Sequence, residues 1–402
     1  MNAPSSRAAS FAGVPYAEVL SRARALVPTL RERAGRAEEA RRLLPETESE
    51  LHRIGLLRYV QPKRYGGMEH DFISIYQVPY ELARGCASTG WNAGNLAVHH
   101  WMLALYDERA QADVWDANPD AKIASGIAYP QGRGRKVDGG FIVSGNWNFS
   151  SAVDGAQWNM LAAIIRDGEK VIDHRMCLVP SSDYEVIDDW QVLGMRGTGS
   201  KSVRANEIFV PEYRALCMYL ARGDSSFPGA KANPNPVFRV PLSALGSHCI
   251  AGVAVGNAQA AVELTCESVK ERSTNYTGMK MRDFQAVQLR VGLAAAKVDG
   301  AHVILKNDCF DAQRIAEENR MPTVEEKLRF KRNVAWAVQL CTEAVDSLHA
   351  MAGANGIYDR YPIQRMFRDA HALMGHFGFS VDAQVPPWGL VALGGAVESP
   401  TL

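Results

Sequence analysis

The sequence predicts a mostly helical fold with a central β-domain. It would comprise an N-terminal helical domain, a β-sandwich or barrel, and a C-terminal four-helix bundle. Apolar residues repeat every three or four positions in the first and last parts of the chain, and every two positions in between. The 402 residues, 47% of them apolar, are too many for one ordinary core and enough to bury several. We therefore expect domains at residues 1–121, 122–222 and 223–402.

The N-terminal domain begins with helices rich in Arg and Glu, and Pro45 suits the first turn of the second helix. A turn at residues 61–67, Gln-Pro-Lys-Arg-Tyr-Gly-Gly, ends this part. Residues 73–106 predict two longer helices, with breaks near Gly85 and around residues 88–91.

Short strands separated by Asp-Gly and Ser-Ser-Asp turns predict an all-β middle region. Its most notable stretch, Ser-Gly-Asn-Trp-Asn-Phe-Ser-Ser at 144–151, follows a hairpin signal at 137–140. Alternating aromatic residues and two closing hydroxyls could hold a flat aromatic cofactor. The same pattern also fits a strand of a sandwich core, and the local sequence alone favours the core.

A glycine-rich stretch at 194–200 resembles a phosphate-binding loop. Residues 203–210 after it predict a strand, whereas dinucleotide and P-loop motifs require a helix there. It is therefore neither of these motifs. Its backbone amides and the hydroxyls of Thr198 and Ser200 could still cradle a phosphate, and the alternative is a plain turn.

The C-terminal part begins with a loop rich in Gly, Ser and Pro at 222–241, which fits a lid, a subunit contact or a disordered segment. Thr323 and Glu326 then form a capping box. The apolar stripes exceed what one chain can cover, so we expect an oligomer, specifically a homotetramer. Apolar stripes predict helices over residues 247–271, 281–319, 323–351 and 364–379.

Composition excludes several classes of partner. Lys plus Arg and Asp plus Glu both number 44, which predicts neither nucleic acid nor an anionic membrane as a partner. No stretch approaches the ~20 apolar residues of a membrane span, and the start lacks a signal peptide, so we expect a cytoplasmic protein. The seven cysteines are scattered without a C-x-x-C pair, which predicts reduced thiols and no metal site.

The order of these parts resembles the acyl-CoA dehydrogenase fold over nearly the whole chain. The turn at 61–67 resembles that superfamily's Pro-x-x-Tyr-Gly-Gly turn, and residues 145–151 resemble its flavin-holding strand. Residues 193–211 resemble its Gly-x-Arg-x-Ser-x-Thr element, and residues 353–356 and 365–371 its C-terminal helices. Together, in order and at suitable separations, these motifs are specific.

The superfamily contains enzymes of different chemistry, and the residue that marks the dehydrogenases is missing here. Acyl-CoA dehydrogenases need a carboxylate base, commonly the Glu of an Ile-Tyr-Glu-Gly-Thr motif. The equivalent stretch, 372–379, has no acid, and neither has 246–256. A dehydrogenase-type flavoprotein remains the alternative. Residues 97–106, 149–154 and 399–402 are instead similar to the oxygenase components of two-component flavin-dependent monooxygenases.

This resemblance implies reduced FMN or FAD as a diffusible cofactor, together with O₂. An NAD(P)H-dependent flavin reductase would supply the reduced flavin. A C4a-hydroperoxyflavin, shielded from water, would then hydroxylate a small phenol-like aromatic substrate. N-hydroxylation of an amino sugar also occurs on this scaffold and remains open.

Position by position, the resemblance implies a catalytic pocket of His99, Ser151, His376 and Ser125. His99 would be the base that accepts the phenol proton, because imidazole titrates near neutral pH. Ser151 would hydrogen-bond N5 of the flavin, His376 would orient or polarise the substrate or peroxide, and Ser125 would bond flavin or substrate. His100 points about 100° away from His99 and is interpreted as structural.

The expected cofactor contacts include aromatic walls, hydroxyls and one arginine that would grip the flavin phosphate, often from a neighbouring subunit. For each aromatic residue, core packing is an equally good interpretation. The residues are Trp91, Phe149, Ser150, Ser151, Thr198, Ser200 and Arg272.

The stretch 237–245 matches least well and limits the substrate prediction. Its Arg239 precedes Pro241, whereas arylacetate hydroxylases of this kind place an arginine after the equivalent proline. Ser243 stands there instead. We therefore expect the substrate to be a neutral phenol, naphthol or polyketide-like aromatic rather than a carboxylate-bearing arylacetate.

Overall fold

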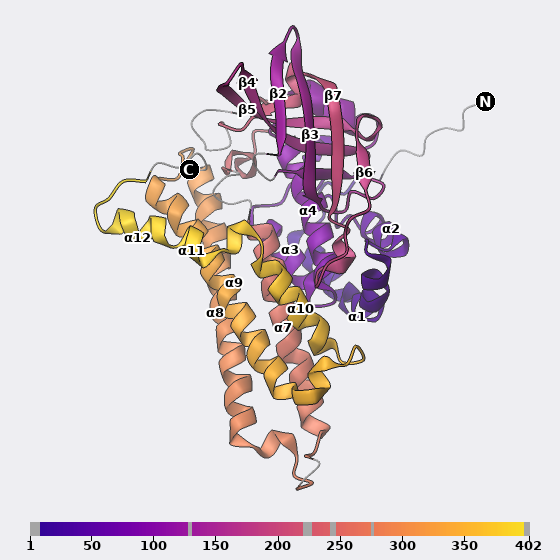
Figure 1. The fold of residues 1–402 in the computed structure, drawn as a ribbon, viewed down its shortest axis with the longest axis vertical. Coiled ribbons are helices and arrows are strands. Elements are labelled where there is room, and N and C mark those ends of the chain that lie inside the picture. The colour runs from indigo at the N-terminus through magenta and orange to yellow at the C-terminus, as the bar shows by residue number, and fades with distance from the viewer. Residues whose placement is uncertain (1–8, 128–130, 220–226, 242–246, 275–276, 398–402) are drawn as a thin grey trace, which may run out of the picture.

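The chain folds as three parts in the predicted order of helices, strands and helices (Figure 1). The β-domain stands at one end of the molecule, and the long C-terminal helices extend away from it at the other. The N-terminal helices lie beside both. The computed structural model describes residues 9–127, 131–219, 227–241, 247–274 and 277–397.

The N-terminal helices confirm most of the sequence prediction, including Pro45 at the start of its helix. The predicted break near Gly85 is confirmed, because one helix ends at Ala83 and the next begins at Ala87. A Cβ at Gly85 would lie 2.8 Å from the Val27 carbonyl oxygen. The second predicted break, at 88–91, is wrong, because this helix runs unbroken from Ala87 to Leu103. A Cβ at Gly90 would lie 2.9 Å from the Ala83 backbone nitrogen, so Gly90 serves close packing against the preceding helix rather than a break. The helices are α1 Tyr16–Ala40, α2 Pro45–Arg53, α3 Ile73–Ala83, α4 Ala87–Leu103 and α5 Glu108–Trp115.

The β-domain is one eight-stranded sheet in the order β6-β7-β3-β2-β4-β5-β8, with β1 paired in parallel to β4. The predicted hairpin turn connects β2 to β3. Trp147 on β3 is fully buried, and its Nε1 donates to the Ala162 carbonyl over 2.8 Å, so it is a core residue. The strands are β1 Ile123–Gly126, β2 Gly132–Val137, β3 Gly140–Ser150, β4 Trp158–Asp167, β5 Lys170–Pro180, β6 Glu185–Ile187, β7 Lys201–Pro211 and β8 Ala215–Cys217.

The C-terminal bundle has the predicted capping box, in which the Thr323 hydroxyl accepts from the Glu326 amide and the Glu326 carboxylate accepts from the Thr323 amide. The predicted final helix over 364–379 is too long, because the helix ends at Met374 and the His376 side chain caps a separate short turn. The helices are α7 His248–Glu271, α8 Gln285–Glu317, α9 Val324–Ala352, α10 Pro362–Met374, α11 Val381–Gln384 and α12 Pro386–Ala392.

Helix α7 is the centre of the bundle and contacts α3, α4, α8, α9 and α10. In length and composition it is, among the described residues, the one helix able to cross a membrane, but 72% of its apolar window is buried inside the protein. Its apolar character therefore matches a core helix.

The described part of the loop before α7 is packed rather than disordered. Val237 and Phe238 are buried, and Trp101 Nε1 donates to the Val237 carbonyl over 2.8 Å. Residues 220–226 and 242–246, including Ser243, lie outside the described residues.

All seven cysteines are free thiols, as predicted. Cys217 and Cys266 are half-buried, and the others are enclosed. Burial raises the pKa of each enclosed thiol above its ordinary value; these are Cys86, Cys177, Cys249, Cys309 and Cys341.

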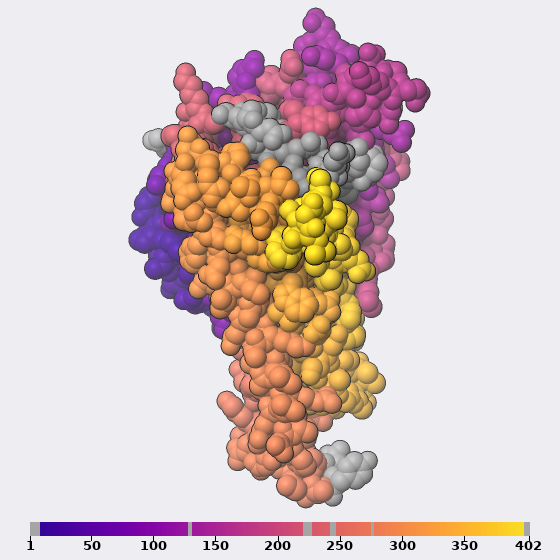
Figure 2. All heavy atoms as spheres, turned by 90° about the vertical axis from the view of Figure 1, so that its left-hand side faces the viewer, coloured from indigo at the N-terminus to yellow at the C-terminus, as the bar shows by residue number. Residues whose placement is uncertain are grey.

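The outer face of α8 is apolar and uncovered in the single chain. Leu289, Leu293, Val303 and Phe310 are between 52% and 61% exposed. The bundle side that includes α8 projects beyond the other two domains (Figure 2). The remaining positions on this face include small residues, Gly292, Ala296 and Gly300. This face has the composition of a helix-packing surface.

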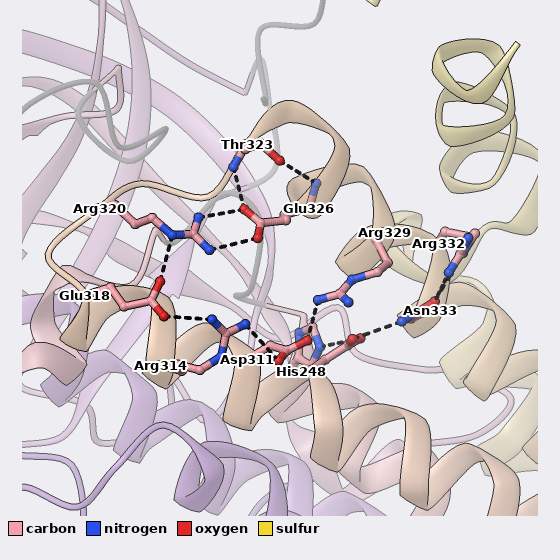
Figure 3. Close-up of polar contacts among 11 residues, drawn as sticks. His248, Asp311, Arg314, Glu318, Arg320, Thr323, Glu326, Arg329, Arg332 and Asn333 are labelled. Atoms are coloured by element: carbon pink, nitrogen blue, oxygen red, sulfur yellow. Dashed lines mark hydrogen bonds and ion pairs between the residues drawn. The ribbon is translucent and has the colours of Figure 1, made fainter.

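Polar side chains connect the ends of α8 and α9 near the β-domain (Figure 3). Arg320 in the α8–α9 connection donates to both Glu318 and Glu326. Deeper in the bundle, the fully buried His248 lies 3.5 Å from Asp308, which also accepts from Asn333. This network joins α7, α8 and α9 and accounts for buried polar residues away from the site described below.

Candidate active site

Helix α4 connects two groups of predicted site residues. Trp91 and His99 are eight residues apart on it, which is ~12 Å along a helix axis. Near Trp91, α4 meets the loop before β7, and near His99 it meets β1. Predicted site residues therefore lie at two places on this helix, which we call the Trp91 end and the His99 end.

At the Trp91 end, four contacts form a continuous line. Trp91 Nε1 donates to Ser151 Oγ over 2.9 Å, and Ser151 Oγ lies 2.7 Å from Ser200 Oγ. Ser200 Oγ lies 2.7 Å from Thr198 Oγ1, which donates to the Met195 carbonyl over 2.9 Å. We call this line, from Trp91 through the three hydroxyls to Met195, the hydroxyl chain.

The direction of every hydrogen bond in the hydroxyl chain follows from its ends. An indole N–H can only donate, and a carbonyl oxygen can only accept. Because the Thr198 proton goes to Met195, the Ser200 proton must go to Thr198, and the Ser151 proton must go to Ser200. Thr198 and Ser200 therefore have no proton left for a phosphate, which argues against the cradle considered from the sequence.

Asp369 supports the far end of the hydroxyl chain, and the sequence reasoning missed it. Its Oδ1 accepts from the Met195 amide over 2.6 Å, and Met195 has a left-handed φ of 54°. Burial raises the pKa of Asp369 to about 6. A signal was available, because Asp369 shares the buried stripe of α10 with Met366 and Leu373, at helical spacing.

An irregular end of β3 separates the two serines of the motif. The register of β3 against β7 shifts between Trp147 and Ser150, and Phe149 has a φ of 65°. Phe149 is consequently 62% exposed, although strict alternation would place it inside with Trp147. Ser150 is fully buried and its Oγ accepts from Asn159 over 3.0 Å. Its side chain therefore belongs to the interior of the β-domain, whereas Ser151 faces α4.

At the His99 end, a buried imidazole has one nitrogen occupied. His99 Nδ1 lies 2.5 Å from the Ile123 carbonyl oxygen, so Nδ1 carries the proton and Nε2 carries the lone pair. Burial lowers the pKa of His99 to about 4, which keeps the ring neutral at pH 7. Ser125 follows two residues after Ile123 on β1 and is also buried.

His376 has the opposite tautomer. Its Nδ1 accepts from the Gly378 amide over 3.1 Å, so in the neutral ring Nε2 carries the proton. The ring meets Trp91 edge-on, with centroids 6.0 Å apart. The atoms packed around the ring lower the pKa of His376. The side chain is exposed in the single chain, so solvent stabilises the protonated ring and opposes this shift more than it does for the buried His99. At Nε2, His99 can therefore accept a hydrogen bond and His376 can donate one.

Two further residues lie away from this arrangement. His100 accepts from Trp115 Nε1 over 2.9 Å and is buried, in agreement with a structural role. Arg272 follows the last residue of α7, whereas α4 approaches the first turn of α7, with Gly94 next to the Cys249 carbonyl. This places Arg272 about 35 Å along α7 from α4 at 1.5 Å per residue, so it does not join the site within one chain.

The residues at the Trp91 end fit a flat heteroaromatic ring such as a flavin. Ser151 Oγ donates once and accepts once in the hydroxyl chain, which leaves one lone pair for a ligand N–H. The Phe149 ring is exposed, Trp91 is half-buried, and His376 offers a donor. Within the described part of the chain, no group of three His, Cys, Asp or Glu residues could hold a metal ion.

Comparisons with known proteins give the same fold. Residues 18–115 match the family model "Acyl-CoA dehydrogenase, N-terminal domain", and residues 248–381 match "Acyl-CoA dehydrogenase, C-terminal domain". A crystal structure of 3-HSA hydroxylase from Rhodococcus sp. RHA1 superimposes with a TM-score of 0.91 at 32% identity, covering 96% of this chain and 99% of that one.

Two curated relatives have the same overall organisation. The flavin-dependent monooxygenase, oxygenase subunit HsaA, of Rhodococcus jostii (strain RHA1) is 35% identical over 88% of this chain and 92% of its own length. The FADH(2)-dependent resorcinol hydroxylase, oxygenase component, of Rhizobium sp. (strain MTP-10005) is 35% identical over 92% of each chain. The chain thus belongs to the family of flavin-dependent monooxygenase oxygenase subunits, built on the acyl-CoA dehydrogenase fold.

Proposed function

We propose that this protein is the oxygenase component of a two-component monooxygenase that hydroxylates a small, neutral, phenol-like aromatic. Reduced FMN or FAD would arrive by diffusion from an NAD(P)H-dependent reductase, and when bound it would supply activated oxygen from O₂. The observation that carries the proposal is the pair of opposite tautomers at His99 and His376, one at the His99 end of α4 and the other against Trp91.

His99 would act on the phenol. Its Nε2 accepts the hydrogen bond of the phenol hydroxyl, which increases electron density on the aromatic ring toward an electrophilic oxygen. The Ile123 carbonyl fixes the orientation of the imidazole through Nδ1. Burial lowers the pKa of His99 to about 4, so the ring does not titrate near neutral pH, in contrast to the expectation from the sequence. Nε2 is unprotonated at pH 7 and can accept this bond.

The hydroxyl chain and His376 would hold the flavin side of the site. Ser151 would offer an acceptor to the ring, and His376 Nε2 would offer a donor that orients or polarises the substrate or the peroxide. Ser125, buried near His99, would bond the substrate or the flavin.

The alternative function, an acyl-CoA dehydrogenase, lacks a base in this arrangement. The stretch 372–379 contains no acid, and His376 stands within it. Asp369, three residues before this stretch, is buried and accepts from the Met195 amide. It therefore supports the protein backbone rather than facing a thioester.

The preference for a neutral aromatic rests on Arg239. Its guanidinium donates to the carbonyls of Ala316 and Pro234, each over 2.9 Å. It is thus engaged with the protein backbone instead of being presented to a substrate carboxylate. N-hydroxylation of an amino sugar, which the resemblance leaves open, is the second reaction to test.

We also propose a cytoplasmic homotetramer. The uncovered apolar face of α8 supports self-association, since its large side chains are more than half exposed in one chain. Arg272, remote from the site of its own chain, would then be available to a flavin bound by a second copy. The free thiols agree with a reducing compartment.

Rapid mixing of protein and photoreduced flavin with aerated buffer tests the function. We expect a flavin species that outlives free reduced flavin in air, and a hydroxylated product when a phenol or naphthol is present. Immediate reoxidation with every phenol, naphthol and amino sugar tried would contradict the proposal. Bleaching of tightly bound oxidised flavin by an acyl-CoA would establish the dehydrogenase alternative instead.

A further inference from the structure

We infer that the hydroxyl chain makes the site selective for reduced over oxidised flavin by fixing Ser151 as a hydrogen-bond acceptor. The inference rests on the proposed function, because it takes the ligand of Ser151 to be the flavin ring. It goes beyond that function by assigning the choice of redox state to Ser200 and Thr198, which need not touch the flavin.

The hydroxyl chain has as many protons as contacts. Four contacts are made by four N–H or O–H groups, each used once, from Trp91 Nε1 to the Met195 carbonyl. Reversing the whole line would leave the Met195 carbonyl without its hydroxyl donor and with the Thr198 amide alone. Reversing only part of it would place two protons, or none, in one contact. The three hydroxyl residues are buried, with at most 8% of each exposed, so water is poorly placed to supply a replacement partner. Ser151 therefore meets a ligand with a lone pair and without a proton.

The ligand changes its hydrogen-bonding character with its redox state. Two-electron reduction of a flavin converts the central ring nitrogen, N5, from a bare acceptor to an N–H donor. A Ser151 oxygen that can only accept forms a hydrogen bond with the N5–H of the reduced ring. Against the oxidised ring, the lone pair of Ser151 meets the lone pair of N5, and the two repel. An unmatched buried pair of this kind weakens binding about ten-fold or more. The site would thus release flavin once it has been oxidised.

The fixed direction depends on the backbone at Met195. Asp369 holds the Met195 amide over 2.6 Å, and the Met195 carbonyl then receives the Thr198 proton. Gly194 beside it packs against the Arg368 carbonyl, where an added side chain would lie only 2.1 Å away. The terminal acceptor is therefore held by α10, on the far side of the hydroxyl chain from the ligand.

Anaerobic titrations of full-length protein with reduced and oxidised FMN and FAD test the inference. Ser200→Ala removes the acceptor of the Ser151 proton, so Ser151 can turn that proton toward oxidised flavin. We expect the ratio of the oxidised to the reduced Kd to fall about ten-fold. The midpoint potential of the bound flavin should fall by about 30 mV, which is the same change for a two-electron couple.

Thr198→Val provides a second variant of nearly equal volume. It leaves the Ser200 proton without its acceptor, so that Ser200 donates to Ser151 and again frees the Ser151 proton. We expect the same direction of change, although Thr198 lies two contacts beyond Ser151. Ser202→Ala is the matched control, since this hydroxyl on β7, two residues after Ser200, bonds Asp189 and Asn148 and lies outside the hydroxyl chain. Its ratio should equal that of the wild type.

The outcomes separate the two proposals. If Ser151→Ala weakens reduced flavin while Ser200→Ala and Thr198→Val leave the ratio unchanged, the inference is overturned and the proposed function stands. If the wild type binds neither redox state, both are overturned. A fall in the ratio for both variants, with Ser202→Ala unchanged, supports the inference.

Discussion

The two ends of α4 handle buried polar groups in opposite ways. At the Trp91 end, a line of small hydroxyls passes hydrogen bonds to the backbone of Met195, which the buried acid Asp369 holds. At the His99 end, one imidazole has a single carbonyl partner and no charged neighbour contributes to its pKa. The first arrangement fixes which way each hydroxyl of the hydroxyl chain donates its proton. The second leaves the lone pair of His99 Nε2 without a donor among the described residues.

In the proposed function, this difference would let one helix serve two chemical tasks. Burial disfavours charge at both ends, but it lowers the pKa of a histidine and raises that of an acid. His99 is consequently neutral at pH 7, while Asp369, with a pKa of about 6, is mostly ionised. Proton binding should therefore affect folding in opposite directions at the two ends.

Removing the Nε2 lone pair of His99 should have the largest effect, on the yield of hydroxylated product. In His99→Asn, the amide can still donate to Ile123 but offers nothing equivalent to Nε2. We expect hydroxylated product per flavin oxidised to fall about 100-fold, the low end for a lost general base, while flavin oxidation continues. Product and peroxide yields measure this. His371→Asn, at an exposed pair with Asp346, is the control and should keep wild-type yields.

Acidification should next destabilise the protein through His99. Its folded pKa, about 4, lies below the ordinary 6.5, so the unfolded chain takes up the proton first. Stability is lost as the pH falls below 6.5, by on the order of 2 kcal/mol between pH 7 and 5. Urea unfolding at both pH values measures this. A pH dependence in His99→Asn as steep as in the wild type would contradict the assignment.

Asp369 should give a smaller effect of opposite sign. Its folded pKa is raised from 3.8 to about 6, so its contribution to stability is present at low pH and lost as the pH rises through 6. Between pH 5 and 7 the loss is about 1 kcal/mol. Asp369→Asn keeps an oxygen for the Met195 amide and should remove this loss. If the variant and the wild type have parallel pH profiles, Asp369 does not titrate in this range.

The sequence predicted the fold well because its signals are local. Periodicity identified the helices and strands, and the capping box at Thr323 needs only four consecutive residues. The break predicted at 88–91 failed because Gly90 serves a contact with α3, which no local pattern reveals.

The candidate site was predicted by residue type but not by arrangement. The resemblance selected Ser151, His99 and His376, yet the tautomers depend on partners such as the Ile123 carbonyl, 24 positions away in the chain. The contact between Met195 and Asp369 joins residues 174 positions apart. The left-handed backbone at Phe149 separates Ser150 from Ser151, and simple strand alternation predicts no such irregularity there.

The enclosed cysteines have a consequence for the durability of the enzyme. Reduced flavin that reacts with O₂ without hydroxylating a substrate releases hydrogen peroxide, and peroxide oxidises thiolates rather than protonated thiols. Burial holds five of the seven thiols in the protonated form, away from solvent. Oxidative damage from uncoupled turnover should therefore begin at the half-buried Cys217 and Cys266 and leave the core intact.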